Sequence, residues 1–173
     1  GENWRIINVF ETLLLVPCLA GHGFEPERRR MPEVATEIVP RNLVLDLHRK
    51  MLTVHYIEER LKIFAKHGKC SFQASTRGHE KLQIGMTLLL RPGYDWFFTY
   101  YREKAIALGL GMSIGDIFLA MLSREGDPSS NGRNMPEHFS SQALRLVAQT
   151  DSTGTQYLPA VGIAKAVKRA GSH

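Results

Sequence analysis

Residues 95–111 read DWFFTYYREKAIALGLG and join an aromatic cluster to a helical pattern that ends in glycines. The cluster leads directly into Arg102, and its members are Trp96, Phe97, Phe98, Tyr100 and Tyr101. Aromatic faces cover flat rings at little entropic cost, and arginine binds phosphate through two parallel hydrogen bonds. The stretch therefore favours a site for a ligand with a flat apolar part and an anionic tail. The alternative is a buried strand whose arginine caps a neighbouring helix.

The composition is that of one ordinary globular domain. The chain has 173 residues, of which 43% are hydrophobic, so it can bury a core and is not disordered by composition. The net charge of +5 comes partly from two local clusters, residues 28–30 and 165–169, without a nucleic-acid reader motif. We therefore expect no nucleic-acid partner.

The cysteines and the missing signature motifs exclude further classes of protein. Cys18 and Cys70 lie far apart, which argues against a zinc site or a disulfide framework and fits a reducing cytoplasm. The sequence holds no Walker loop and no GxGxxG, GxSxG or HExxH motif. A self-contained kinase or hydrolase is therefore unsupported.

Residues 1–41 differ from the rest of the chain. The apolar run over residues 12–20 is too short to span a bilayer, and we expect no membrane association. It resembles the core of a signal peptide, but nearby acidic residues and the lack of an opening methionine weigh against that interpretation. Residues 21–41 contain three prolines and two glycines. We expect residues 1–41 to be an extension or linker and residues 42–173 to form the domain.

A long amphipathic helix is expected from about Leu43 onward, with Asn42 as its N-cap and Gly68 as its C′ residue. Its apolar residues recur at steps of three and four positions, and they are Leu43, Leu47, Met51, Val54, Ile57, Leu61 and Phe64. The charged residues assigned to the solvated side are Glu58, Glu59, Arg60 and Lys62.

Shorter elements follow. A polar loop leads into a second helix over about residues 78–90, and Ser113 with Asp116 forms a capping-box-like start for another that continues to about residue 124. Short strands are expected near residues 94–99 and 144–150. Residues 125–137 are too rich in glycine, proline, serine and asparagine for a regular element, so they form a long loop.

The last segment combines a polar bend with a helix of small side chains. Residues 150–155 are polar or glycine, and a helix starts near Gln156 with Pro159 in its first turn. Hydroxyl groups gathered at a helix start suit a bound ion. The alternative is a simple cap, in which the hydroxyls bond the first N–H groups of the helix.

Four short motifs occur in order along residues 43–171. They are Gly78-x-Glu80, Tyr101-Arg102-Glu103, Gly132-Arg133-x-Met135-Pro136-x-His138, and Gly154-Thr155-Gln156 followed by Pro159-Ala160-Val161-Gly162. Each is weak alone. Together they resemble the α subunit of the thiamine-diphosphate-dependent decarboxylating component of 2-oxo acid dehydrogenases, most of all the branched-chain, 2-oxoisovalerate type.

The resemblance implies a cofactor site. Tyr101 and Arg102 match residues that contact the diphosphate, with Tyr100 beside them, and Asp151 and Thr153 fall where the family places further cofactor contacts. The cofactor supplies the carbanion chemistry in such enzymes, so the protein must fix its diphosphate and orient its ring. An arginine and a tyrosine hydroxyl suit the first task.

The resemblance also implies a catalytic residue, a substrate-side loop and a second ion. His138 aligns with a histidine near the aminopyrimidine ring and the substrate, and Phe72 and Gln73 match the substrate-side loop. A histidine can move protons near neutral pH. The positions that match a potassium-type loop are Thr150, Ser152, Thr155 and Gln156.

Two parts of the family's site are not found in this sequence. The magnesium motif, Gly-Asp-Gly followed by an asparagine, does not occur up to His173, and the glutamate that activates the aminopyrimidine belongs to a β subunit or a fused β-like half. We therefore expect an N-terminal piece of an α/β thiamine-diphosphate-binding fold, itself predominantly α-helical with one or two short strands. Exposed apolar helix faces predict low independent stability or association.

The function implied by the resemblance is oxidative decarboxylation of a branched-chain 2-oxo acid with acyl transfer to lipoyl, in branched-chain amino acid catabolism. Thiamine diphosphate, Mg²⁺ and K⁺ are the expected cofactors, and a β subunit and a lipoyl-bearing acyltransferase are the expected partners. The expected location is the cytoplasm, or the mitochondrial matrix in a eukaryote. The alternatives are a non-catalytic helical interaction module derived from the fold and a pyruvate- or acetoin-type relative. We expect the chain to be inactive on its own.

Overall fold

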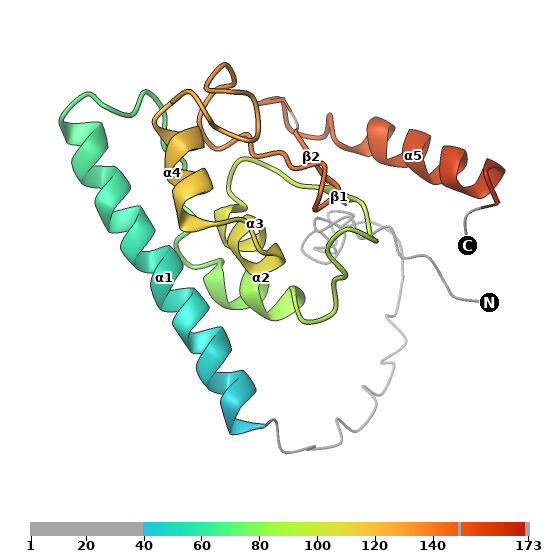
Figure 1. The fold of residues 1–173 in the computed structure, drawn as a ribbon, viewed down its shortest axis with the longest axis horizontal. Coiled ribbons are helices and arrows are strands. Elements are labelled where there is room, and N and C mark those ends of the chain that lie inside the picture. The colour runs from blue at the N-terminus through green and yellow to red at the C-terminus, as the bar shows by residue number, and fades with distance from the viewer. Residues whose placement is uncertain (1–39, 149, 172–173) are drawn as a thin grey trace, which may run out of the picture.

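The computed structural model describes residues 40–148 and 150–171, and within them the chain is mostly helical (Figure 1). The elements occur in the order α1 Arg41–Lys66, α2 Glu80–Met86, β1 Phe97–Phe98, α3 Lys104–Leu110, α4 Ile114–Met121, β2 Leu146–Val147 and α5 Tyr157–Arg169. This arrangement confirms the expected helical chain with short strands. The predicted extension and its signal-peptide interpretation lie outside the described residues, apart from residues 40 and 41.

The long helix α1 forms because its apolar residues share one face, which packs against α2 and α3. It ends as predicted, since Gly68 has a φ of +66° and its N–H donates to the carbonyl of Ala65. The predicted N-cap is wrong. Pro40 is the N-cap, and its carbonyl accepts the N–H groups of Leu43 and Val44, so Asn42 lies inside the first turn.

Two of the shorter helices are shorter than their sequence pattern predicts. Gly78 has a φ of +86°, outside the helical region, so α2 starts two residues later than expected, and it ends at Met86, four residues earlier than expected. α4 begins as predicted, with the Ser113 hydroxyl accepting the Asp116 N–H at 3.0 Å. It ends before residue 124 because Ser123 adopts a left-handed φ of +49°.

The two strands pair in parallel, with Phe97 opposite Leu146 and Phe98 opposite Val147. Parallel pairing requires a crossover, which α3, α4 and the loop over residues 125–137 supply. Because both strands run in the same direction, the residues that follow β1 and those that follow β2 leave the same edge of the sheet. Ligand sites of open α/β sheets lie at such edges.

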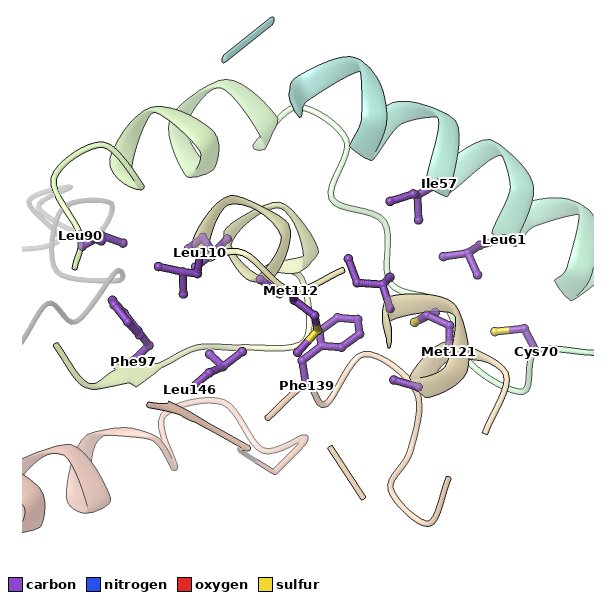
Figure 2. Close-up of a cluster of buried hydrophobic side chains, with 14 residues drawn as sticks. Ile57, Leu61, Cys70, Leu90, Phe97, Leu110, Met112, Met121, Phe139 and Leu146 are labelled. Carbon is purple, nitrogen blue, oxygen red and sulfur yellow. The ribbon is translucent and has the colours of Figure 1, made fainter. Parts of the chain in front are cut away.

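The main core joins α1, α3 and α4 to both strands (Figure 2). Its fully or nearly fully buried side chains include Leu61, Phe97, Ile106, Leu110, Ile117, Met121, Phe139 and Leu146. A smaller cluster of Val54, Ile84 and Ala105 ties α1 to α2 and α3. The β1 strand and the start of α3 are therefore held on both sides, which fixes the segment between them.

Helix α5 leads away from the body of the molecule in Figure 1 and contacts β1. Ala160 is buried, whereas Leu158 is 82% exposed and Val161 is 64% exposed. The helix thus presents apolar side chains to solvent, although the exposed face was expected to run from Ala160 to Val167 and Ala160 is buried. The low stability inferred from this face stays a prediction. No helix within the described residues is long and apolar enough to cross a membrane.

Candidate functional site

The parallel sheet brings the segment after β1 next to the bend after β2. The Tyr100 hydroxyl donates to the backbone oxygen of Asp151 at 3.0 Å and lies 2.9 Å from Thr153 Oγ1. Tyr100 itself is buried, and burial raises the pKa of its hydroxyl. Two segments about fifty positions apart in the sequence, both predicted to contact the same ligand, are therefore joined by one side chain.

Aromatic rings gather beside this junction around Tyr101. Its ring centroid lies 3.9 Å from that of Tyr100, 5.8 Å from that of Phe72 and 6.2 Å from that of His138. Phe72 meets Tyr101 edge to face, at an interplanar angle of 84°. The rings of Phe72, Tyr100, Tyr101 and His138 come from three separate segments and form an aromatic wall. Of the cluster predicted from residues 95–101, Tyr100 and Tyr101 belong to this wall. Phe97 and Phe98 form the buried strand β1 instead, so for these two residues the alternative of a buried strand is correct.

His138 is buried, and both of its ring nitrogens lie close to oxygen atoms. Nδ1 lies 3.2 Å and 3.0 Å from the carbonyl oxygens of Met135 and Pro136, and Nε2 lies 2.6 Å from Asp151 Oδ1 without the alignment of a hydrogen bond. Because carbonyl oxygens only accept, Nδ1 donates. The contact between Nε2 and the carboxylate is favourable only when Nε2 also carries a proton. His138 therefore presents a protonatable nitrogen toward the junction.

Arg102 lies at the exposed side of the same junction. Its guanidinium carbon is 5.4 Å from the centre of the Tyr101 ring, and Nη1 donates to the backbone oxygen of Ser75 at 3.4 Å. Its own backbone oxygen accepts from Gln83 Nε2 at 3.1 Å, which fixes the main chain. The guanidinium makes one long hydrogen bond among the described residues. Its other N–H groups can donate hydrogen bonds to an anion.

The polar bend over residues 150–156 folds back on itself. The Thr150 and Thr155 hydroxyls are 2.8 Å apart, and Thr155 Oγ1 donates to the carbonyl of Ser152 at 2.8 Å. The N-cap of α5 is Gln156, with no side-chain capping bond, so the alternative of a simple hydroxyl cap is wrong. Gln156 is 1% exposed, and its Oε1 has no hydrogen-bond donor among the described residues.

The substrate-side loop is divided between two environments. Phe72 turns toward Tyr101, whereas Gln73 donates from Nε2 to the backbone oxygen of Glu58 at 3.4 Å. The structure therefore brings Phe72 to the aromatic wall and places the Gln73 amide against α1.

Sequence reasoning missed the charged centre behind the site. Lys104 Nζ lies 3.0 Å from Glu58 Oε1 and 2.8 Å from Glu137 Oε1, and all three side chains are fully buried. The assignment of Glu58 to the solvated side is wrong. Glu58 follows Val54 by four positions and precedes Leu61 by three, so its place on the apolar stripe of α1 was the signal that could have found it.

Burial and charge act in opposite directions on the two carboxyl groups. Burial tends to raise the pKa of Glu58, but the Lys104 ammonium and hydrogen bonds from Thr76 and Ser75 lower it below its ordinary value. For Glu137, burial dominates and raises the pKa to about 7, although Lys104 opposes the shift. Lys104 therefore lies between a Glu58 whose pKa is lowered and a Glu137 whose pKa is raised.

No group of three or more His, Cys, Asp or Glu side chains within residues 40–148 and 150–171 is arranged to hold a metal ion. The close oxygen contacts at the bend are between the hydroxyl groups of Thr150 and Thr155 and the carbonyl group of Ser152.

An aromatic wall, an exposed arginine and a hydroxyl-rich bend at one edge of a parallel sheet define a candidate site for a ring-bearing, anionic cofactor. The chain belongs to the dehydrogenase E1 component family, whose sequence model matches residues 48–173. Enzymes of this family use thiamine diphosphate.

Several relatives are 2-oxoisovalerate dehydrogenase α subunits. That of Bacillus subtilis is 35% identical over 70% of this chain, the mitochondrial protein of Dictyostelium discoideum is 32% identical over 98%, and that of Pseudomonas aeruginosa is 29% identical over 86%. The matches cover 37%, 38% and 34% of these relatives, so the chain spans little more than a third of their length.

Proposed function

We propose that this chain supplies one wall of the thiamine-diphosphate site of a 2-oxo acid dehydrogenase of the branched-chain type. The observation that carries the proposal is the Tyr100 hydroxyl, which joins the Tyr101–Arg102 segment to the bend at Asp151 and Thr153. When bound, thiamine diphosphate supplies the carbanion chemistry of decarboxylation. The chain's own residues bind it, orient it and move protons beside it.

Arg102 and Tyr101 are the residues that hold the diphosphate in this proposal. The exposed guanidinium can donate two parallel hydrogen bonds to a phosphate, and the adjacent ring limits its directions of approach. Tyr100, Asp151 and Thr153 hold the second side of the same edge. A diphosphate between these segments meets donors from both.

The bend over residues 150–156 is the proposed potassium site. Its hydroxyl and carbonyl oxygens come from Thr150, Ser152 and Thr155, and the buried Gln156 Oε1 lacks a donor among the described residues. A buried amide oxygen without a partner costs stability, and a monovalent cation would satisfy it. We propose that the ion stiffens the bend that carries Asp151 and Thr153.

His138 is the proposed proton carrier. Its Nδ1 donates to backbone carbonyls, so in this proposal Nε2, which lies 2.6 Å from Asp151 Oδ1, is the nitrogen that exchanges a proton. Phe72 and Gln73 form the proposed substrate side, where the ring of Phe72 offers an apolar surface. A branched aliphatic group of a 2-oxo acid suits such a surface.

The remaining parts of the proposed reaction lie on partners. We propose that a β subunit or fused β-like half supplies the activating glutamate, that the Mg²⁺ ligands lie mostly outside this sequence, and that the acyl group passes to a lipoyl-bearing acyltransferase. Relatives in both bacteria and mitochondria fit the cytoplasm of a bacterium or the matrix of a eukaryotic mitochondrion.

Titration calorimetry with thiamine diphosphate and Mg²⁺, with and without a β subunit, tests the proposal. Arg102→Ala is expected to weaken binding by about tenfold to a hundredfold, because a hydrogen bond to a charged group contributes roughly 1.5–3 kcal/mol. Arg49→Ala, on the exposed side of α1, is the matched control and is expected to leave binding unchanged. Absence of binding with the partner present, even in a longer chain that includes the Gly-Asp-Gly magnesium motif, would favour the non-catalytic module instead.

A further inference from the structure

Lys104 is the point at which three separate parts of the site meet. It is the first residue of α3, two positions after Arg102. Its Nζ donates to Glu58 of α1 at 3.0 Å, to Glu137 at 2.8 Å and to the backbone oxygen of Ala74 at 3.4 Å. Glu137 directly precedes His138, and Ala74 follows Phe72 by two residues.

The two carboxyl groups also bind the loop that carries Phe72. Glu58 Oε1 accepts the N–H of Thr76 at 3.0 Å, and Glu58 Oε2 accepts the Ser75 hydroxyl at 3.1 Å. Glu137 Oε1 accepts the N–H of Ala74 at 3.2 Å. The loop over residues 74–76 is therefore bonded to the network through its backbone and one hydroxyl, independently of its side-chain packing.

Glu137 bonds Lys104 and the Ala74 N–H through a single carboxylate oxygen. Its Oε1 binds Lys104 and the Ala74 N–H, while Oε2 has no partner among the described residues. The residue also has a φ of +74°, a left-handed conformation that is uncommon for glutamate. Such a backbone persists only when its surroundings hold it, and here the carboxyl group is the anchor.

A buried ion network is weak evidence for net stability, because the desolvation of its charges offsets their attraction. Its geometry is nevertheless strict, since every member must keep its partner in a medium without water. The network of Glu58, Lys104 and Glu137 links α1, α3, the Phe72 loop and the segment that carries His138. These are the elements whose relative positions define the aromatic wall.

We propose that Lys104, held between Glu58 and Glu137, is a positioning residue that sets where His138 and Phe72 stand relative to the Tyr101–Arg102 pair. The identity of the ligand, thiamine diphosphate, rests on the proposed function above. The positioning role of Lys104 does not depend on that ligand. Lys104 holds Glu137, which directly precedes His138, and it holds the backbone of Ala74, two residues after Phe72.

Two substitutions of Glu137 separate positioning from simple stabilisation. Glu137→Gln keeps the length and the accepting oxygen, so the bonds to Lys104 and Ala74 survive. Glu137→Asn suits a positive φ better than glutamate does, but its side chain is one methylene shorter and releases Lys104. The matched control is Glu59→Gln, which alters the neighbouring but solvent-exposed pairs with Lys62 and Arg77.

The measurement is made by NMR on the full chain without ligand, from the nuclear Overhauser contact between the His138 and Tyr101 rings and from the His138 ring shifts. We expect both to match the wild type in E137Q and E59Q, and to be lost or shifted in E137N while the chain stays folded. Lys104→Gln tests the same network from α3 and is expected to behave as E137N does. Unchanged ring contacts in folded E137N and K104Q would overturn the positioning role.

A thiamine diphosphate titration with Mg²⁺ and a β subunit, run on the same variants, keeps this inference distinct from the proposed function. Weaker thiamine diphosphate binding in E137N but not in E137Q would support both the positioning role and the proposed function. If a wild-type chain that includes the Gly-Asp-Gly magnesium motif does not bind while the ring contacts still depend on Glu137, the proposed function fails and the positioning role stands.

Discussion

The loop that carries Phe72 and the bend over residues 150–156 face the same pair of tyrosines, but they are held by different means. The Phe72 loop is bonded to buried carboxyl groups on α1 and next to His138. The bend is mostly exposed, and its hydroxyls bond one another and the bend's own carbonyls. One side of the site is thus built into the core, and the other depends on the Tyr100 hydroxyl, on Asp151 beside His138 and on what binds there.

This difference follows from the place of each segment in the fold. The Phe72 loop lies against α1 and α3, which pack together and exclude water. The bend lies between β2 and α5, and of the residues in α5 only Ala160 is buried. Buried polar groups need hydrogen-bond partners within the protein, whereas exposed polar groups bond water and remain available to a ligand. The Phe72 loop is thus pre-organised, and the bend over residues 150–156 is exposed. This combination suits a site that a cofactor enters from the exposed side.

Removing the charge of Lys104 tests the side of the site that holds the Phe72 loop, and it has the largest expected effect on the free energy of unfolding. Lys104→Met leaves Glu58 and Glu137 buried without their cation, and breaking a buried pair in this way typically costs about 3–5 kcal/mol. Lys50→Met removes the exposed pair with Asp46 and is expected to cost less than about 1 kcal/mol. Urea denaturation of the two variants measures both. Similar losses in both would mean that the network does not hold the core.

The pH dependence of stability gives an intermediate effect. Burial raises the pKa of Glu137 and of Glu103 from 4.5 to about 7, so the folded chain binds these protons more tightly than the unfolded chain. Their stabilisation is complete below about pH 4.5 and is lost as the pH rises to about 7. Each group contributes a slope of up to about 1.4 kcal/mol per pH unit.

Glu137→Gln is expected to remove about half of that slope, since Glu103 keeps its own share. Urea denaturation at pH 5, 6 and 7 compares the variant with the wild type. The pKa of Glu58 is lowered, so its contribution is lost only at more acidic pH and does not affect this window. Equal slopes for the two proteins would show that Glu137 is ionised throughout.

The sequence could predict the local elements better than the contacts between distant segments. The helical pattern, the capping residue Ser113 and the two strand positions follow from local spacing and were confirmed by the structure. The meeting of Tyr100 with Asp151 depends on parallel pairing between distant segments, and the sequence reached it only through family resemblance. No local rule assigns such a pairing.

The buried network was missed for a different reason. A glutamate in a helix is ordinarily solvated, and Lys104 and Glu137 lie 46 and 79 positions beyond Glu58, so nothing local indicates that the three meet. Only the place of Glu58 on the apolar stripe of α1 departs from the usual pattern. Charged residues at such positions are the ones that merit a search for buried partners.

Hydrogen exchange of the backbone amides tests the contrast between the two sides most directly. Without ligand, the amides of residues 54–61 and 74–76 should exchange slowly and those of residues 150–156 rapidly. The former lie within α1 or donate to buried carboxyl groups, whereas the bend is mostly exposed. Adding thiamine diphosphate and Mg²⁺ with a β subunit should slow residues 150–156 and 100–102 selectively. A bend that is already as protected as residues 74–76, or one that is unaffected by the cofactor, would contradict the account.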